Sequence, residues 1–182
     1  NEPDNSGIKI PSTVKQIHGF NSAKITITNF VFNDITAKGG LWYDTRPTTL
    51  DYSIRDLEVD CTGTGSTSFG FRNCTNLTNC TGTGTGGNCY GFSSCTNLTN
   101  CTGTGTGVDN GSGYGFSDCT NLTNCAGTGT GTFGYGFRYI TYASNCSDGG
   151  SSTAMWGGVN KNINVETCRK TLVTADNSEL NT

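Results

Sequence analysis

Apolar residues recur at every third position through the middle of the chain, a spacing that fits neither a plain strand nor a helix. Five four-residue sets follow it: Phe71/Cys74/Leu77/Cys80, Phe92/Cys95/Leu98/Cys101, Phe116/Cys119/Leu122/Cys125, Phe137/Ile140/Ala143/Cys146 and Val159/Asn162/Val165/Cys168. Apolar character persists while residue identity drifts, which indicates that these side chains face a core. The spacing predicts short strands joined by corners, where a residue outside the strand conformation resets the alternation of side chains.

The second cysteine of these sets marks the period of the repeat. Aligned cysteines stand at Cys61, Cys80, Cys101, Cys125, Cys146 and Cys168, with steps of 19, 21, 24, 21 and 22 residues. Such a period is typical of a solenoid, in which each repeat forms one coil and packs on its neighbours. Because the units consist of short strands, the expected fold class is all-β.

The residue before each second cysteine is the predicted corner. It is asparagine in four units, at Asn79, Asn100, Asn124 and Asn145, with Asp60 in its place in the first unit and Thr167 in the last. Asparagine tolerates the left-handed backbone conformation that a corner needs, and its amide can pair with the same amide one coil above. The pattern predicts a ladder of buried asparagines.

A Thr-Gly run follows each corner, and its strict alternation points the glycines inward and the threonines outward. Stacked coils place these threonines in a grid, about 4.8 Å apart between coils and about 7 Å apart along a strand. The predicted grid comprises Thr62, Thr64, Thr81, Thr83, Thr85, Thr102, Thr104, Thr106, Thr128, Thr130 and Thr132. Inward glycines have no bulk, so this wall is expected to be flat. Unit length varies only after the run, at 86–89 and 107–113, where loops are expected.

The ladders resemble those of the pectate-lyase-like superfamily, whose coils carry internal aromatic, aliphatic and asparagine stacks. This resemblance implies a right-handed parallel β-helix of about seven coils, with Asn, Cys, Leu and Phe ladders, and it transfers no catalytic residue. The unit that spans 91–101 is also similar to segments of phage tail fibres and of surface proteins of Gram-positive gut bacteria.

A second resemblance involves the treponema-type leucine-rich repeat. It is carried by Gly-Phe-Ser-Ser-Cys-Thr-Asn-Leu-Thr at 91–99 and by Ile-Lys-Ile-Pro-Ser-Thr-Val-Lys-Gln-Ile at 8–17. The Thr-Gly run departs from that family, which would place a second Ile-x-Ile-Pro segment there. The β-helix therefore remains the expected fold.

Three regions are expected from these patterns. Residues 1–60 form irregular opening coils and a cap, 61–168 form the regular coils, and 169–182 form a terminal cap or the start of another segment. Alternating apolar residues predict a strand over 22–32. The segment 41–47 combines large aromatic residues with proline and charges and has no periodicity, so it is expected to be a protruding loop.

Charge and composition exclude several classes of partner. The net charge is −3, and the repeats from Cys61 to Cys125 hold only Arg72, Asp109 and Asp118 as charged residues. No basic stripe can neutralise phosphates, so no nucleic-acid partner is expected. No apolar run is long enough to cross a bilayer, and no membrane insertion is expected.

Ten cysteines and one histidine give no metal-ligand spacing. No Cys-x-x-Cys pair occurs, and we expect neither a metal site nor a cofactor. Ladder cysteines lie close enough for a disulfide, but their parallel side-chain vectors make its dihedral unfavourable. Buried free thiols are therefore expected.

Three outward carboxylates, Asp56, Glu58 and Asp60, are the candidates for catalysis. Pectate lyases and spike glycosidases use such clusters to hold calcium or to act as acid and base. The alternative is a solvated strand, because an enzyme needs a second wall and only Asp44, Arg46 and Asp51 are available for it. A further ladder, Phe69, Tyr90, Tyr114 and Tyr135, is expected to be buried packing; exposed rings would stack on sugars.

These observations favour a non-enzymatic fibre segment, either structural or receptor-binding, from a phage tail or a bacterial surface. We expect it to be a homotrimer in an extracellular or virion-surface location, with loops such as 108–110 free to contact a host glycan or receptor. The Thr-x-Thr grid also resembles the ice-binding face of β-solenoid antifreeze proteins, which is the first alternative. A polysaccharide lyase or glycosidase is the second.

Overall fold

A computed structural model describes residues 8–31, 38–43, 45–64, 67–149, 156–157, 161–163 and 169–170 of the 182-residue chain. Its strands are β1 (Ile8–Lys9), β2 (Gln16–Val31), β3 (Lys38–Trp42), β4 (Ser53–Thr64), β5 (Thr67–Arg72), β6 (Thr75–Thr78), β7 (Thr81–Ser93), β8 (Thr96–Thr99), β9 (Thr102–Ser117), β10 (Thr120–Thr123), β11 (Ala126–Thr130), β12 (Tyr135–Arg138), β13 (Thr141–Ser144), β14 (Ser147–Asp148), β15 (Trp156–Gly157), β16 (Lys161–Ile163) and β17 (Arg169–Lys170). Every described strand pairing is parallel, so the chain is an all-β parallel β-solenoid.

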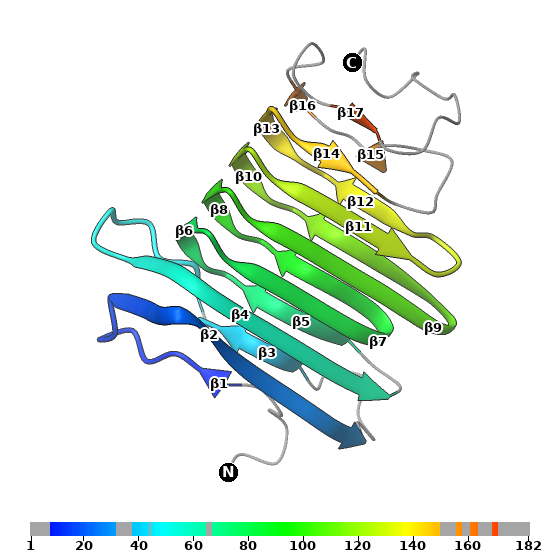
Figure 1. Ribbon diagram of the computed structural model, residues 1–182, viewed down its shortest axis with the longest axis horizontal. Helices are drawn as coiled ribbons and strands as arrows, with labels where there is room; N and C mark the ends of the chain where they lie inside the picture. Colours follow the sequence, from blue (N-terminus) through cyan, green and yellow to red (C-terminus); the bar gives the residue numbers. More distant parts are fainter. Residues whose placement is uncertain are drawn as a thin grey trace.

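Each coil has three walls, and the walls of successive coils stack side by side (Figure 1). The Thr-Gly wall contains 58–62, 81–86, 102–107 and 126–130. The aromatic wall contains 67–72, 88–93, 112–117 and 135–138. The Leu wall contains β6, β8, β10 and β13. The structure shows about four turns rather than the seven expected, because all three walls are described only between residues 53 and 148.

In the first four sets, the residues at every third position form the core, as predicted, whereas the side chains of Val159, Asn162, Val165 and Cys168 lie outside the described part of the chain. Phe71, Phe92, Phe116 and Phe137 are fully buried, and their rings stack at centroid distances of 4.9 to 5.2 Å with interplanar angles of 5 to 8°. Leu77, Leu98 and Leu122 pair in register, which confirms the leucine ladder. Each such buried side chain contributes about 1.5–3 kcal/mol through the hydrophobic effect.

Three left-handed residues per coil, rather than the single corner predicted, explain the spacing of three. They form three columns along the solenoid: Asn73/Ser94/Asp118/Tyr139, Asn76/Asn97/Asn121/Tyr142 and Asp56/Asn79/Asn100/Asn124/Asn145. All have φ between 49° and 63°. Each left-handed residue resets the side-chain alternation, so the residue that follows it points inward. Asparagine and aspartate tolerate this conformation better than other residues with side chains.

The column position of Asp56 corrects the predicted register of the first coil. Glu58 pairs with Thr81 and Cys61 pairs with Gly84, so Leu57, not Cys61, occupies the position of the second cysteine. The left-handed corner is Asp56, with φ 54°, and not Asp60. The cysteine alignment failed because the left-handed residue sets the register, and the first coil has an aspartate there and a leucine after it.

The asparagine ladder exists, but it lies on the surface instead of in the core. Asn100 Nδ2 donates to Asn79 Oδ1 at 3.3 Å, and Asn124 Nδ2 donates to Asn100 Oδ1 at 3.1 Å. Asn145 Nδ2 donates to Asn124 Oδ1 at 2.6 Å. All four residues are exposed. The inward positions belong to the neighbouring Leu and Cys residues, so the corner side chains project outward and pair there.

Inward glycines bring the Thr-Gly wall into backbone contact with the aromatic wall. A Cβ atom added to Gly103 would lie 2.4 Å from Gly115 O, and one added to Gly129 would lie 2.3 Å from Gly113 O. Side chains normally hold stacked sheets about 10 Å apart. The coil is therefore a wedge, with the Phe, Leu and Cys ladders at its wide end and paired glycines at its narrow end.

The opening coils are strands that follow the same winding. β2 pairs with β4 with two register shifts, which confirms the strand predicted over 22–32. The loop predicted over 41–47 was wrong in its first half, because Leu41 and Trp42 belong to β3, pair with Phe71 and Arg72, and are buried. The loop begins after Tyr43, which is also buried; Asp44 lies outside the described residues.

The nine described cysteines are buried thiols outside any disulfide, as expected: Cys61, Cys74, Cys80, Cys89, Cys95, Cys101, Cys119, Cys125 and Cys146. Burial raises the pKa of Cys61 and of Cys89 to about 11 and raises the pKa of Cys95 well above its usual range. These thiols stay protonated at neutral pH and act as small apolar side chains. Cys168 lies outside the described residues.

Candidate functional site

The Thr array of the Thr-Gly wall is regular over three coils, in a register that differs from the predicted one. Thr81, Thr83 and Thr85 pair with Thr102, Thr104 and Thr106. The next coil aligns Ala126, Thr128 and Thr130 with these, not Thr128, Thr130 and Thr132. Thr132 lies in the turn after β11 and outside the array. The shift arises because this coil has alanine directly after its cysteine.

The array also begins differently from the prediction. Thr62 pairs with Thr85 through the backbone, while Thr64 pairs with Val31 beyond the array. Glu58 and Asp60 occupy the columns of Thr81 and Thr83 in the coil below. Eight threonines of 81–130 thus form a grid without charges, whose side chains are partly or largely exposed: Thr81, Thr83, Thr85, Thr102, Thr104, Thr106, Thr128 and Thr130.

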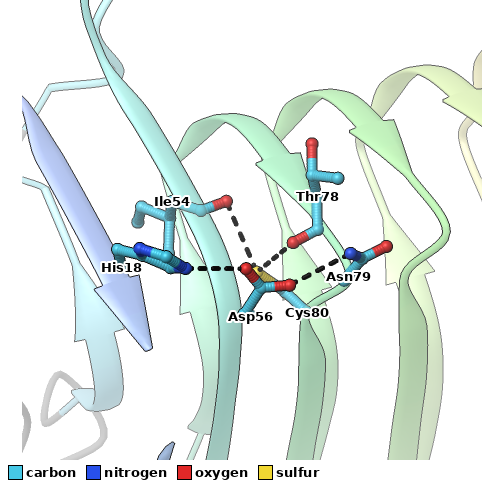
Figure 2. Close-up of polar contacts among 6 residues, drawn as sticks. All are labelled: His18, Ile54, Asp56, Thr78, Asn79 and Cys80. Carbon is cyan, nitrogen blue, oxygen red and sulfur yellow. Dashed lines mark hydrogen bonds and ion pairs between the residues drawn. The ribbon is translucent and has the colours of Figure 1, made fainter. Parts of the chain in front are cut away.

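Asp56, the first catalytic candidate, is held by two neighbouring coils (Figure 2). Asn79 Nδ2 donates to its Oδ1 at 3.0 Å, and His18 Nε2 lies 2.9 Å from its Oδ2. The hydrogen bond from Asn79, followed by that of His18, lowers the pKa of Asp56. A general acid needs a raised pKa. Asp56 is therefore placed to accept a hydrogen bond at the end of the asparagine ladder and not to donate a proton.

Glu58 and Asp60 share one lysine from the coil below. Lys24 Nζ lies 2.8 Å from Glu58 Oε1 and 3.5 Å from Asp60 Oδ2, and the hydrogen bond to Glu58 raises the pKa of Lys24. Sequence reasoning missed this cation because the strand of Lys24 precedes the regular repeat. A carboxylate pair engaged by an ammonium group is poorly placed to hold calcium or to act as acid and base.

The residues considered for a second wall are engaged elsewhere. Arg46 Nη1 donates to Ser94 O at 3.3 Å. Asp51 forms an exposed ion pair with Lys15, at 3.2 Å. The structure therefore gives no catalytic pairing of Arg46 or Asp51 with the acidic strand.

The ladder Phe69, Tyr90, Tyr114 and Tyr135 consists of stacked rings. Successive centroids are 5.1, 5.1 and 6.0 Å apart, and Phe69 and Tyr114 are only 6% and 8% exposed. Tyr90 and Tyr135 are half-buried. Because the ring faces contact one another, this ladder presents few free faces to a sugar.

Two exposed tyrosines were not singled out from the sequence. Tyr139 and Tyr142 are 40% and 51% exposed and belong to two columns of left-handed residues otherwise made of Asn, Asp and Ser. The Arg138 guanidinium lies 4.3 Å from the ring centroid of Tyr139 and 4.8 Å from that of Tyr114. The signal in the sequence was their replacement of asparagine-like residues in the repeat.

A surface cavity of about 210 Å³ lies between loop 46–50 and the Leu wall. Its wall side is formed by Thr75, Asn76, Thr96 and Asn97. Thr96 Oγ1 is buried and has no hydrogen-bond partner among the described residues. A second cavity, of about 440 Å³, lies at the start of the solenoid beside Lys9 and Tyr43.

Within the described ranges, no group of three or more His, Cys, Asp or Glu residues is arranged to hold a metal ion. The same ranges contain no helix long and apolar enough to span a membrane.

The fold defines the chain as a parallel β-solenoid protein with asparagine ladders, buried cysteines and aromatic stacks. Comparisons with family models, curated proteins and solved structures found no match.

Proposed function

We propose that this chain is a non-enzymatic segment of a fibre, either a shaft or a receptor-binding part of a phage tail fibre or bacterial surface adhesin. The observation that supports this best is the continuous register of the coils. In every wall, like residues stand above like residues over successive turns. Parallel ladders of this kind resist bending because each coil is bonded to both neighbours.

The proposed coil is right-handed, as in the pectate-lyase-like superfamily that the ladders resemble. Parallel strands joined by crossovers are right-handed in nearly all proteins, because of the twist of the strands. The lyase or glycosidase alternative depends on Asp56, Glu58 and Asp60, whose pairing with His18 and Lys24 gives it no support.

The thiols favour a fibre that folds in a reducing compartment. Buried free cysteines in register would be exposed to mispairing if the unfolded chain met an oxidising environment. A virion protein assembled inside the host cell avoids this, and its final location would be the virion surface. A secreted adhesin would have to bury its thiols after export, before they are oxidised.

The Thr array is the proposed contact between subunits of a homotrimer. It is a regular surface without charge over three described coils, and its backing by paired glycines gives it little side-chain bulk. An uncharged, flat, repetitive face can pack against its own copies without desolvating ions.

Sedimentation velocity tests this proposal. The wild-type protein is expected to sediment as a rod of three 19.1-kDa chains, and Thr83→Lys with Thr104→Lys is expected to shift it to monomers. Val108→Lys is the matched control and should leave the trimer intact; Val108 lies within β9, at the register shift after the array, and not in a separate loop as predicted. A wild-type protein that stays monomeric at all concentrations would contradict the trimer.

Ice binding is the second candidate, and the observation that favours it is the in-register Thr-x-Thr grid. Rows of Thr83, Thr104 and Thr128 repeat at the coil spacing of about 4.8 Å, with neighbours about 7 Å away along each strand. Thermal hysteresis and ice-crystal shaping test it. A parent protein without hysteresis eliminates this function, whereas hysteresis abolished by Thr83→Lys with Thr104→Lys would replace the fibre proposal.

A further inference from the structure

The Leu wall has two features that interrupt its repetition, and they border the same stretch of surface. At one end, loop 46–50 stands over β6 and β8 and encloses the 210 Å³ cavity. At the other end, Tyr142 stands in β13, in the column of Asn97 and Asn121 and two coils beyond Asn97. Between them the wall presents asparagine and threonine side chains.

The cavity is lined by groups that hydrogen-bond to hydroxyls. Thr96, whose Oγ1 atom is buried and has no partner among the described residues, lines this cavity together with Arg46, Thr48, Thr49 and Asn97. A buried hydroxyl without a partner is unfavourable, and a bound polar group would satisfy it. Arg46 uses one nitrogen on Ser94 O, and its guanidinium has further N–H donors.

Tyr142 departs from its column at an energetic cost. Its φ is 63°, in a region that bulky residues avoid, while the three coils below it have asparagine at this position. Asn97 Nδ2 donates to Asn76 Oδ1 at 2.9 Å, and Asn121 Nδ2 donates to Asn97 Oδ1 at 2.8 Å. Tyr142 has no amide with which to continue this ladder beyond Asn121, and it is 51% exposed.

We propose that the Leu wall between loop 46–50 and Tyr142 binds a short saccharide chain that lies parallel to the solenoid axis. The first sugar occupies the cavity and forms hydrogen bonds with Thr96 Oγ1 and Arg46. The following sugars contact the side-chain amides of Asn97 and Asn121. The last sugar packs its apolar face on the ring of Tyr142. The coil spacing of about 4.8 Å is close to the length of one pyranose unit, so each coil serves one sugar.

A saccharide fits this surface better than a peptide does. The backbone groups of the Leu wall are engaged in pairing between coils, so the wall has no free strand edge for an added peptide strand. What remains are side-chain hydroxyls, amides and one aromatic face, which match sugar hydroxyls and the apolar face of a pyranose ring. The inference rests on the proposed receptor-binding function and gives its ligand class.

An array of neutral, amino and acidic oligosaccharides tests the proposal on the full chain. The wild-type protein is expected to bind at least one of them, and Tyr142→Asn is expected to weaken that binding at least about tenfold. The melting temperature of Tyr142→Asn should be equal or higher, because asparagine suits the left-handed backbone and extends the ladder. Thr96→Val, which keeps the shape and removes the hydroxyl, should also weaken binding.

Thr104→Val makes the same change on the Thr-Gly wall and should leave binding unchanged. Unaltered affinity in both Tyr142→Asn and Thr96→Val would overturn the site. A wild-type trimer that binds no oligosaccharide, or that binds only members of a displayed peptide library, would rule out a saccharide ligand without contradicting the proposed fibre function. A monomer that binds the oligosaccharide through these two residues would retain the site and remove the trimer.

Discussion

At the residue scale, the left-handed corner residues determine the fold. Fifteen non-glycine residues of the described chain have positive φ, and twelve of them are Asn or Asp. Each corner resets the alternation, so inward residues fall at every third position. The side chains of the corner residues then pair along the surface, as in Asn100 with Asn79. One residue type thus supplies both the backbone conformation and the contact between coils.

Replacing a ladder asparagine tests this dual role. Asn124→Ala is expected to destabilise the protein by about 1–2 kcal/mol, because alanine pays the full cost of the left-handed conformation and breaks two amide contacts. Asn124→Gly removes only the contacts and should cost less. Urea unfolding measures both. Equal losses for the two variants would show that the backbone conformation is not what asparagine provides.

Asp56 makes the stability of the first coil dependent on pH. Its folded pKa is lowered, mainly by the Asn79 hydrogen bond, so its contribution is complete above the unfolded pKa and is lost as pH falls below about 4. Asp56→Asn keeps a side chain that suits the left-handed backbone and removes the titration. The melting temperature of the variant should therefore fall less than that of the wild type between pH 5 and pH 2, in scans of about one-unit steps. Equal decreases in melting temperature for the two proteins between pH 5 and pH 2 would disprove this assignment.

At the scale of the elements, the Thr-Gly wall and the aromatic wall are in direct backbone contact. Gly82 and Gly103 face the backbone of the opposite wall, and an added Cβ would approach a carbonyl oxygen to 2.5 and 2.4 Å respectively. The two walls cannot separate without disturbing the pairing between coils. This contact therefore also keeps the Thr array flat.

Gly103→Ala is expected to cost about 1–3 kcal/mol or more, because the methyl group overlaps Gly115 O and overpacks the walls. Thr102→Ala, one residue earlier and outward, changes an exposed side chain and should stay within about 0.5 kcal/mol of the wild type. Thermal unfolding followed by circular dichroism gives both values. A neutral Gly103→Ala would mean that the walls are farther apart than described.

The cysteine ladders give a separate test of the core. Buried thiols with raised pKa values should not react with an aromatic disulfide reagent in the native protein at neutral pH. Guanidinium chloride should release ten reactive thiols per chain. Rapid labelling of any of the nine described cysteines, located by peptide mass spectrometry, would contradict the packing of the ladders.

At the scale of the whole molecule, the repeat predicted the core of the described coils well and the register of the first coil poorly. Phe92, Leu98 and Cys101 face inward as predicted. The prediction succeeded because apolar periodicity reports burial directly. Register was harder: Cys61 looked like a ladder cysteine, but the corner at Asp56 places Leu57 there. Lys24 could not be matched to Glu58, because their coils share no repeated motif.

The candidate surfaces were also predicted only in part. The Thr array was predicted because alternation is local, while its exact partners at Ala126 and Thr62 depended on coil length. The cavity under loop 46–50 could not be predicted, since it requires the loop to fold back over Thr96, a contact between irregular and repeated segments. Tyr142 was visible in the sequence as a break in the asparagine column, but only the left-handed φ shows its cost.

The central claim is that the Thr array joins the subunits of a homotrimer, and spin-label distance measurement tests it most directly. Because the nine described thiols are buried, a label attached to Thr102→Cys, at the exposed border of the array, would be selective in a Cys168→Ser background. The account predicts strong dipolar coupling between subunits for this label and weaker coupling for one attached to Asn110→Cys, at the register shift of β9 beyond the array. Absent coupling at Thr102→Cys, or stronger coupling at Asn110→Cys, would contradict it.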